Sequence, residues 1–419
     1  MKRILFLSLI LTLAACREQL PDFPEVSEPY AVTSGPHDHF LANYFGIDAW
    51  SPDGRYLTVL ETDVNGRLAA EGEEATLALI DLKDGNKLIP ISTTRCWNFQ
   101  EAAMFHWLPW EDGACIFNDC RDGQFVSVIY NWKTGTERII PYPVSAVSRD
   151  GKTAVSINYA RLRLCRPDYG YAGSGQNPHR ESIWPDNDGL WVVDLTTGKG
   201  KLILSIQEAA LMIPPIVNPN GLAYFCHTAL SRNAKKIFFL ARSVENLDEQ
   251  VAEFGHVKVW NTASLTIDVD GGNLRRCFPD GWRGSHFNWF GDDTMVVTAR
   301  WDGGGCWSHT LFKVGDEANV RHLAPGIMDW DGHCIFSPDG KFISSEGYWN
   351  KDGYRSWVLM RLEDEAIISL GRFFVPDNYK EQYSRCDLHA RWRSDGSQLA
   401  FNSVHEGSRQ VYLRDVKWK

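Results

Sequence analysis

The chain has 419 residues and a formal net charge of −10, with 17 Trp, 14 Tyr and 21 Phe. This charge gives no overall attraction to polyanions and argues against nucleic acid as a partner, so basic groups for an anionic ligand must be local. The length suffices for one large core or two domains, and the aromatic content is typical of all-β proteins and of carbohydrate binders.

The first residues predict export and a lipid anchor. Residues 1–3 are basic at two positions, residues 4–15 form a short apolar run, and Cys16 follows. The run is too short to remain in a bilayer as a spanning helix. Residues 13–16 (Leu-Ala-Ala-Cys) resemble the bacterial lipobox, in which the Cys becomes the lipidated first residue. An ordinary signal peptide with a chance Cys is the alternative.

Two or more acyl chains anchor a protein stably, so we expect contact with the membrane through lipid alone. Position 17 is Arg rather than Asp, which by the bacterial sorting rule predicts an outer-membrane lipoprotein facing the periplasm or the cell exterior. Nine cysteines remain after Cys16; their odd number leaves at least one free thiol or metal ligand in an oxidising compartment.

One pattern then recurs along the chain: an apolar stretch, a turn of the type Ser-Pro-Asp-Gly, and an alternating strand. Asp-Gly between alternating apolar runs is a hairpin signal. The seven copies of the turn, some of them loose, fall at residues 51–54, 108–113, 148–151, 231–233, 291–293, 337–340 and 394–396. Each unit supplies about four strands, which predicts a seven-bladed β-propeller.

The last unit has three clear strands and then the chain ends. The segment at residues 30–33 can supply the fourth strand, which closes the ring and removes an open edge. We therefore predict a signal peptide at 1–15, a lipidated Cys with a polar tether at 16–30, and one propeller domain at 31–419.

Four consecutive units carry His at one repeat position, four residues before the turn: His227, His286, His333 and His389. This position starts the innermost strand of a blade, beside the central channel. Four imidazoles around one axis suggest a metal site, and Cys386, three residues before His389, favours zinc. The alternative is that these side chains only bind backbone groups. Five residues exceed one tetrahedral shell, so we assign His286, His333, Cys386 and His389 to the metal and exclude His227.

A second group of polar residues lies in the first three units. It includes His39, Gln100, His106, Arg121 and the stretch 158–173, which is rich in Arg, Tyr and Gly. The last stretch, extended to residue 184, is interpreted as an insertion between units three and four. Long loops on one propeller face commonly carry function, although a plain solvated loop is the alternative.

These segments carry a family resemblance, over residues 35–40, 97–107, 118–123, 166–173 and 386–389. The chain resembles the seven-bladed β-propeller polysaccharide lyases, namely the ulvan lyases of that fold and, more distantly, oligogalacturonate lyase. The match covers nearly the whole mature chain. The repeated turns alone are weak evidence, because TolB-type propellers share them.

The resemblance implies β-elimination at a uronic acid, most simply in ulvan, by a monomeric enzyme. The substrate carboxylate must be neutralised, a base must remove the C5 proton, and an acid must protonate the leaving oxygen. We assign these roles to Arg121, to His39, and to His106 or Tyr159. Substrate contacts are expected from Gln100, Arg161 (also the reserve neutraliser), Tyr171 and His227. The metal is structural in the ulvan type and catalytic in the oligogalacturonate type.

The sequence departs from the ulvan pattern because a second His, about twenty residues after the first, is replaced by a stretch with Glu61. The alternatives are therefore an enzyme of the same fold acting on rhamnose–glucuronate, a glycosidase, and a non-catalytic propeller that binds a glycan or protein at the envelope. A glycosidase needs paired carboxylates, and we find no persuasive pair.

Overall fold

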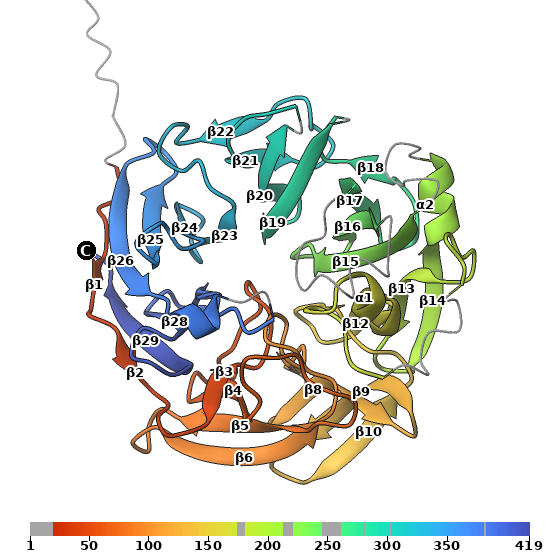
Figure 1. Cartoon of the computed structure of the whole chain (residues 1–419), viewed down its shortest axis with the longest axis horizontal. Helices are drawn as coiled ribbons and strands as arrows, with labels where there is room; N and C mark the ends of the chain where they lie inside the picture. The colour runs from red at the N-terminus through yellow and green to blue at the C-terminus, as the bar shows by residue number, and fades with distance from the viewer. Residues whose placement is uncertain are drawn as a thin grey trace, which may run out of the picture.

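The computed structural model describes residues 20–173, 181–212, 221–244, 261–279, 281–301, 303–380 and 383–419. The leader and Cys16 lie outside these residues. Seven antiparallel sheets follow one another around a ring (Figure 1). The predicted seven-bladed propeller is confirmed, and among the described residues no helix has the length and apolar character needed to cross a membrane.

Six blades have four strands each, in chain order from the channel to the rim. Blade 1 contains β3 (Asp38–Leu41), β4 (Tyr56–Thr62), β5 (Ala75–Asp81) and β6 (Lys87–Thr94). Blade 2 contains β7 (His106–Trp107), β8 (Ala114–Arg121), β9 (Gln124–Asn131) and β10 (Thr136–Ile140). Blade 3 contains β11 (Ala146–Val147), β12 (Thr153–Ser156), β13 (Gly189–Asp194) and β14 (Lys199–Ser205).

The second half of the ring repeats this order. Blade 4 contains β15 (Leu222–Leu230), β16 (Lys236–Val244), β17 (Asn261–Asp268) and β18 (Arg275–Arg276). Blade 5 contains β19 (Trp282–Phe290), β20 (Thr294–Trp301), β21 (Ser308–Lys313) and β22 (Arg321–Leu323). Blade 6 contains β23 (Gly332–Phe336), β24 (Phe342–Gly347), β25 (Tyr354–Arg361) and β26 (Ile367–Phe374).

Blade 7 joins the two ends of the chain, as the sequence predicts. β27 (Arg391–Trp392), β28 (Gln398–Ser403) and β29 (Gln410–Lys417) come from the C-terminus, and β1 (Glu25–Val26) and β2 (Tyr30–Ala31) both pair with β29. The red and blue segments lie side by side in Figure 1. The propeller therefore begins at Glu25, inside the segment that we predicted to be a tether.

The repeated turn is held by its own side chains. In the first copy the Ser51 hydroxyl donates to Asp53 (2.5 Å) and accepts from the Tyr56 amide (2.9 Å), while Gly54 takes a φ of 67°. This positive φ is cheap only for glycine. The same Ser–Asp bond recurs at Ser148 and Ser337, each 2.6 Å long. These local bonds explain why the motif marks the turn between the first two strands of a blade.

The helices are short. α1 (Tyr159–Cys165) begins at Asn158, whose side chain accepts from the Arg161 amide, and α2 (Ile206–Met212) follows β14. A 3-10 turn, η3, spans Asp377–Tyr379. Because α1 follows β12 and precedes β13, the long insertion lies within blade 3, and the predicted place between units three and four is wrong.

Candidate functional site

The four histidines of the repeat position meet at the channel. The rings of His286 and His333 are 4.0 Å apart, and those of His333 and His389 are 4.5 Å apart, between centroids. Tyr44, from the loop after β3, lies 5.6 Å from His227 and 5.3 Å from His389. All four histidines are buried. The predicted convergence around one axis is therefore present, with Tyr44 packed among the rings.

The backbone at this repeat position is unusual. Met104, His227 and His389 have φ values of 50°, 57° and 45°, in the left-handed region that residues other than glycine rarely adopt. Met104 and His389 lie just before the inner strands of their blades, and His227 lies at the irregularity within β15, so three blades share this costly bend. Non-glycine residues in this region cluster at binding and catalytic sites, where the surrounding fold maintains the strain.

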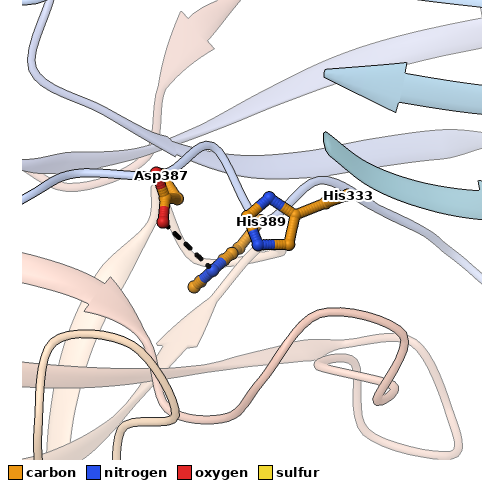
Figure 2. Close-up of side chains that lie close together, drawn as sticks. All are labelled: His333, Asp387 and His389. Carbon is orange, nitrogen blue, oxygen red and sulfur yellow. Dashed lines mark ion pairs between the residues drawn. The ribbon is translucent and has the colours of Figure 1, made fainter. Parts of the chain in front are cut away.

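Three side chains form a compact donor group: His333, Asp387 and His389 (Figure 2). One ligand atom from each lies within 4.8 Å of the others, and Asp387 Oδ2 is 3.9 Å from His389 Nε2. The Nε2 atoms of His333 and His389 are buried without a hydrogen-bond partner. A buried nitrogen without a hydrogen bond costs free energy. Two such nitrogens beside a carboxylate therefore fit a site for a divalent cation.

Glu346 prepares His333 for this role. Its carboxylate accepts from His333 Nδ1 at 2.6 Å and from the His389 backbone amide at 3.1 Å. With Nδ1 donating, Nε2 of neutral His333 carries the lone pair, and burial lowers the pKa of His333 and keeps it neutral. A carboxylate behind a ligating imidazole is the usual support of metal-binding histidines. Glu346 was missed by sequence reasoning, because nothing local in the sequence links it to His333.

Asp387 is held by two buried cations. Arg355 Nη2 donates to one carboxylate oxygen, and Arg385 Nε donates to the other at 2.8 Å. Burial acts to raise the pKa of Asp387, but the two guanidinium groups overcome it and hold this pKa well below its usual range. Gln100 exchanges hydrogen bonds with Arg385 at 3.0 and 3.2 Å. The predicted substrate contact Gln100 is thus buried and positions Arg385.

Two predicted ligands stand apart from the donor group. The Cys386 thiol packs in an apolar cluster with Val375 and Tyr379, and burial raises the pKa of Cys386 to about 11, so it stays a thiol. Cys386 is absent from the donor group of His333, Asp387 and His389, so the thiolate that favoured zinc is not among its ligands. The nine cysteines that the structure describes are all unpaired.

His286 lies beside the donor group but is paired with a carboxylate. Its Nδ1 is 2.7 Å from Asp331, which also accepts from the Thr298 hydroxyl at 2.7 Å. Burial opposes ionisation of Asp331, yet His286 and these hydrogen bonds lower the pKa of Asp331 to about 2. An ionised carboxylate on Nδ1 leaves Nε2 as the nitrogen that can accept a proton. This arrangement is typical of a general base.

Tyr348 is the exposed residue of this region, and sequence reasoning missed it. Its ring lies 6.3 Å from the His286 ring, and the guanidinium carbons of Arg355 and Arg385 are each 5.4 Å from its centroid. Tyr348 is 39% exposed, whereas the histidines beside it are buried. Part of its side chain is therefore open to solvent, while burial of its hydroxyl raises the pKa of Tyr348. We call Tyr348, His286, Arg355, Arg385 and the donor group the channel-mouth site.

The residues predicted to be catalytic lie elsewhere and share no hydrogen bond. His39 is buried on β3, with Nε2 2.9 Å from Glu61 and Nδ1 3.1 Å from Gln410. Both nitrogens are engaged, so proton removal by His39 requires breaking a contact. Glu61 does stand where the resemblance expects a second His, and it touches the first.

Arg121 ends β8, the second strand of blade 2 counted from the channel. Its Nε lies 2.7 Å from Asp119 and its Nη2 3.5 Å from Glu137. The guanidinium is 37% exposed, but two carboxylates already neutralise it. The predicted neutraliser is therefore oriented toward the edge of its own blade.

Tyr159, Arg161 and Tyr171 are fully buried. The Tyr159 ring stacks on Tyr171 at 4.3 Å, the Tyr171 hydroxyl accepts from Asn118, and Arg161 donates to the carbonyl oxygens of Ala223, Ser182 and Ile183. A dissolved polymer cannot reach these groups, which corrects their predicted contact with substrate. They instead hold the blade 3 insertion against the channel.

His106 and His227 are also buried. His106 Nδ1 donates to the Met104 carbonyl at 2.8 Å, and burial lowers the pKa of His106 to about 4. A neutral imidazole is a poor acid near neutral pH, so the predicted acid role is not supported. His227 lies under the ring of Tyr169 at 4.7 Å, away from solvent. His227 is absent from the donor group, as predicted, and its contact with substrate stays a prediction.

Glu101 gives a pH-dependent prediction. It is buried beside the Tyr159 hydroxyl (3.3 Å), and burial raises the pKa of Glu101 from 4.5 to about 8. The folded state therefore holds a proton that the unfolded state releases, so this group stabilises the fold below about pH 4.5 and that contribution is lost as the pH rises through about 8. Between these limits we expect the free energy of unfolding to fall less in Glu101→Gln than in the parent. The difference should be a few kcal/mol, because each pKa unit corresponds to about 1.4 kcal/mol. Urea unfolding at both ends of the window measures this; parallel curves would refute it.

No family model and no curated protein sequence matches the chain. Its fold is similar to an oligogalacturonate lyase from Vibrio parahaemolyticus, with TM-score 0.62, 13% identity, and coverage of 95% of this chain and 98% of that one. An oligogalacturonate lyase in complex with manganese gives a TM-score of 0.62 at 15% identity, with coverage of 96% of this chain and 97% of that one. The tricorn protease gives a TM-score of 0.51 at 9% identity, with coverage of 90% of this chain and 34% of that one. At these identities the comparison establishes the fold alone.

Proposed function

We propose that the chain is a polysaccharide lyase that cleaves an acidic, uronic-acid-containing polysaccharide at the channel-mouth site. The observation that supports this proposal is that the exposed Tyr348 lies beside His286 and two buried arginines. His286 is hydrogen-bonded to a carboxylate. A base, an acid and two guanidinium groups thus lie together beside one partly exposed side chain. The oligogalacturonate lyases of similar fold support this class of reaction.

The reaction is a β-elimination. His286 Nε2 takes the proton from C5 of the uronic acid while Asp331 stabilises the imidazolium that forms. The C4–O bond breaks, the electron pair of the former C5–H bond forms the C4–C5 double bond, and the Tyr348 hydroxyl gives its proton to the leaving O4. Transfer of the proton from His286 to Tyr348 restores both groups, and no water is consumed.

Charge at the substrate carboxylate decides whether C5 can lose its proton. Arg355 and Arg385 lie under Tyr348, but the buried carboxylates of Glu346 and Asp387 offset their charge. Net positive charge for the substrate carboxylate would therefore come from a bound cation. His333, Asp387 and His389 are the residues that fit a divalent cation. A cation held there would add positive charge at the base of the site.

The donor group favours no single metal. Two imidazoles and one carboxylate suit zinc, and also manganese, with which an oligogalacturonate lyase of similar fold forms a complex. Three protein donors leave a coordination position open, as in catalytic metal sites, whereas the burial of all three limits access from solvent.

Ulvan and oligogalacturonate are the two candidate substrates that the test must distinguish. Ulvan follows from the sequence resemblance, and oligogalacturonate from the similarity of fold. Both present a uronate carboxylate next to a glycosidic O4. We further propose that Cys16 is lipidated and places the enzyme at the outer membrane, where such polymers arrive.

The test is the ultraviolet absorbance of the unsaturated product, with residues 17–419 on ulvan, polygalacturonate, alginate and rhamnose–glucuronate polymers. We expect a rise on one of them, lost in His286→Ala and reduced about 100-fold or more in Tyr348→Phe. Arg121→Ala is the matched control, because Asp119 and Glu137 already pair with Arg121, and it should retain activity. Activity that survives His286→Ala and disappears in Arg121→Ala would return the site to blade 2.

A non-catalytic glycan-binding propeller is the second candidate. The observation in its favour is that His39, His106, Arg121 and Tyr159 share no hydrogen bond in the described residues. Binding to one polymer of the panel, without any unsaturated or reducing product, would establish it.

A further inference from the structure

The hairpin between β24 and β25 of blade 6 carries aromatic residues outward from the channel-mouth site. Tyr348 and Trp349 follow β24, with ring centroids 6.2 Å apart. Tyr354 opens β25 and pairs with Phe374 at the end of β26, with rings 5.4 Å apart. Tyr348 and Phe374 are 39% and 41% exposed. Exposed aromatics in a row, starting at a site, mark a binding surface.

The two outer rings are accompanied by cations. The Arg372 guanidinium carbon lies 4.7 Å from the Tyr354 ring, and the Lys380 ammonium, which also pairs with Asp377, lies 5.9 Å from the Phe374 ring. A carbohydrate with carboxylate groups matches this alternation, because sugar rings present apolar C–H faces to aromatics while their carboxylates pair with cations.

The hairpin is held in one conformation. The Asn350 side chain accepts from the amides of Asp352 and Tyr354, both at 3.0 Å, and its backbone amide donates to Tyr354 O at 2.8 Å. Trp349 packs against the buried cluster around Val375. A preformed surface loses little conformational entropy when a ligand binds.

We infer that the aromatic hairpin of blade 6, with Phe374 at its outer end, binds the sugar units of an acidic polysaccharide next to the cleaved linkage. The identity of the cleaved linkage rests on the proposed lyase function; the binding surface rests on the hairpin itself. The chain of the polymer then runs radially across blade 6. Phe374 contributes affinity for long chains and takes no part in bond cleavage.

The test is affinity electrophoresis of residues 17–419 in gels containing ulvan or polygalacturonate, together with steady-state kinetics on polymer and on short oligomers. We expect Phe374→Ala to weaken retardation about tenfold and to raise KM for polymer with little change in kcat. Tyr348→Phe should keep the retardation and lose turnover. Trp110→Ala is the matched control, since Trp110 is 43% exposed but lies on the turn between β7 and β8, at the opposite end of the strands.

The outcomes separate the two proposals. Retardation that falls in Phe374→Ala, in a chain that cleaves nothing, supports the inference and removes the lyase. Cleavage with retardation and KM equal in Phe374→Ala and the parent overturns the inference and leaves the lyase. A parent chain that neither gel retards overturns the inference. Melting temperatures of all variants show whether a loss reflects unfolding.

Discussion

Replacing Arg355 by Met should lower the free energy of unfolding by about 3 to 5 kcal/mol. Arg355 is 1% exposed and donates to both Glu346 and Asp387, which are themselves buried. The methionine fills the space but leaves two carboxylates with less compensation, and an uncompensated buried charge is among the costliest changes in a protein core. Urea unfolding followed by tryptophan fluorescence measures the change.

The matched control is Arg321→Met. Arg321 binds Glu365 at 2.7 Å, but its side chain is 45% exposed, and such pairs contribute about 0 to 1 kcal/mol. Equal losses in the two variants would contradict the buried network as a source of stability.

Replacing His333 by Ala should abolish tight binding of one divalent cation. His333 Nε2 is one of the buried nitrogens without a partner, and alanine removes a ligand outright. Glu346→Gln keeps the imidazole but weakens the support on Nδ1, so we expect an affinity about 10 to 100 times lower. Competition with a chromophoric chelator, for zinc and for manganese, gives both constants.

His322→Ala is the matched control, because His322 is exposed and belongs to no donor group in the described residues. Cys386→Ser adds a second comparison and should bind the metal as the parent does. Binding that survives His333→Ala and disappears in Cys386→Ser would restore the thiolate that the sequence suggested.

The repeat made the fold predictable. Ser51, Asp53 and Gly54 hold their turn through bonds within five residues, so the motif can be recognised without the rest of the chain. The closing strand was also predictable, because the last blade lacked one and an edge must be covered. The register of the histidines followed from the same repeat.

The chemistry of the site was less predictable, because it depends on contacts between blades. Asp331 supports His286 across 45 residues, and Gln100 reaches Arg385 across 285. No local pattern announces such pairs. Burial was the other missing quantity: Tyr159 and Arg161 have suitable chemistry but lie in the core, whereas Tyr348 has the same chemistry at the surface.

The measurement that tests the central claim most directly is mass spectrometry of the products formed in water labelled with heavy oxygen. The account predicts fragments whose masses add up to that of the substrate, with a double bond at the new non-reducing end and no label. Label in the new reducing end would show hydrolysis and contradict the lyase.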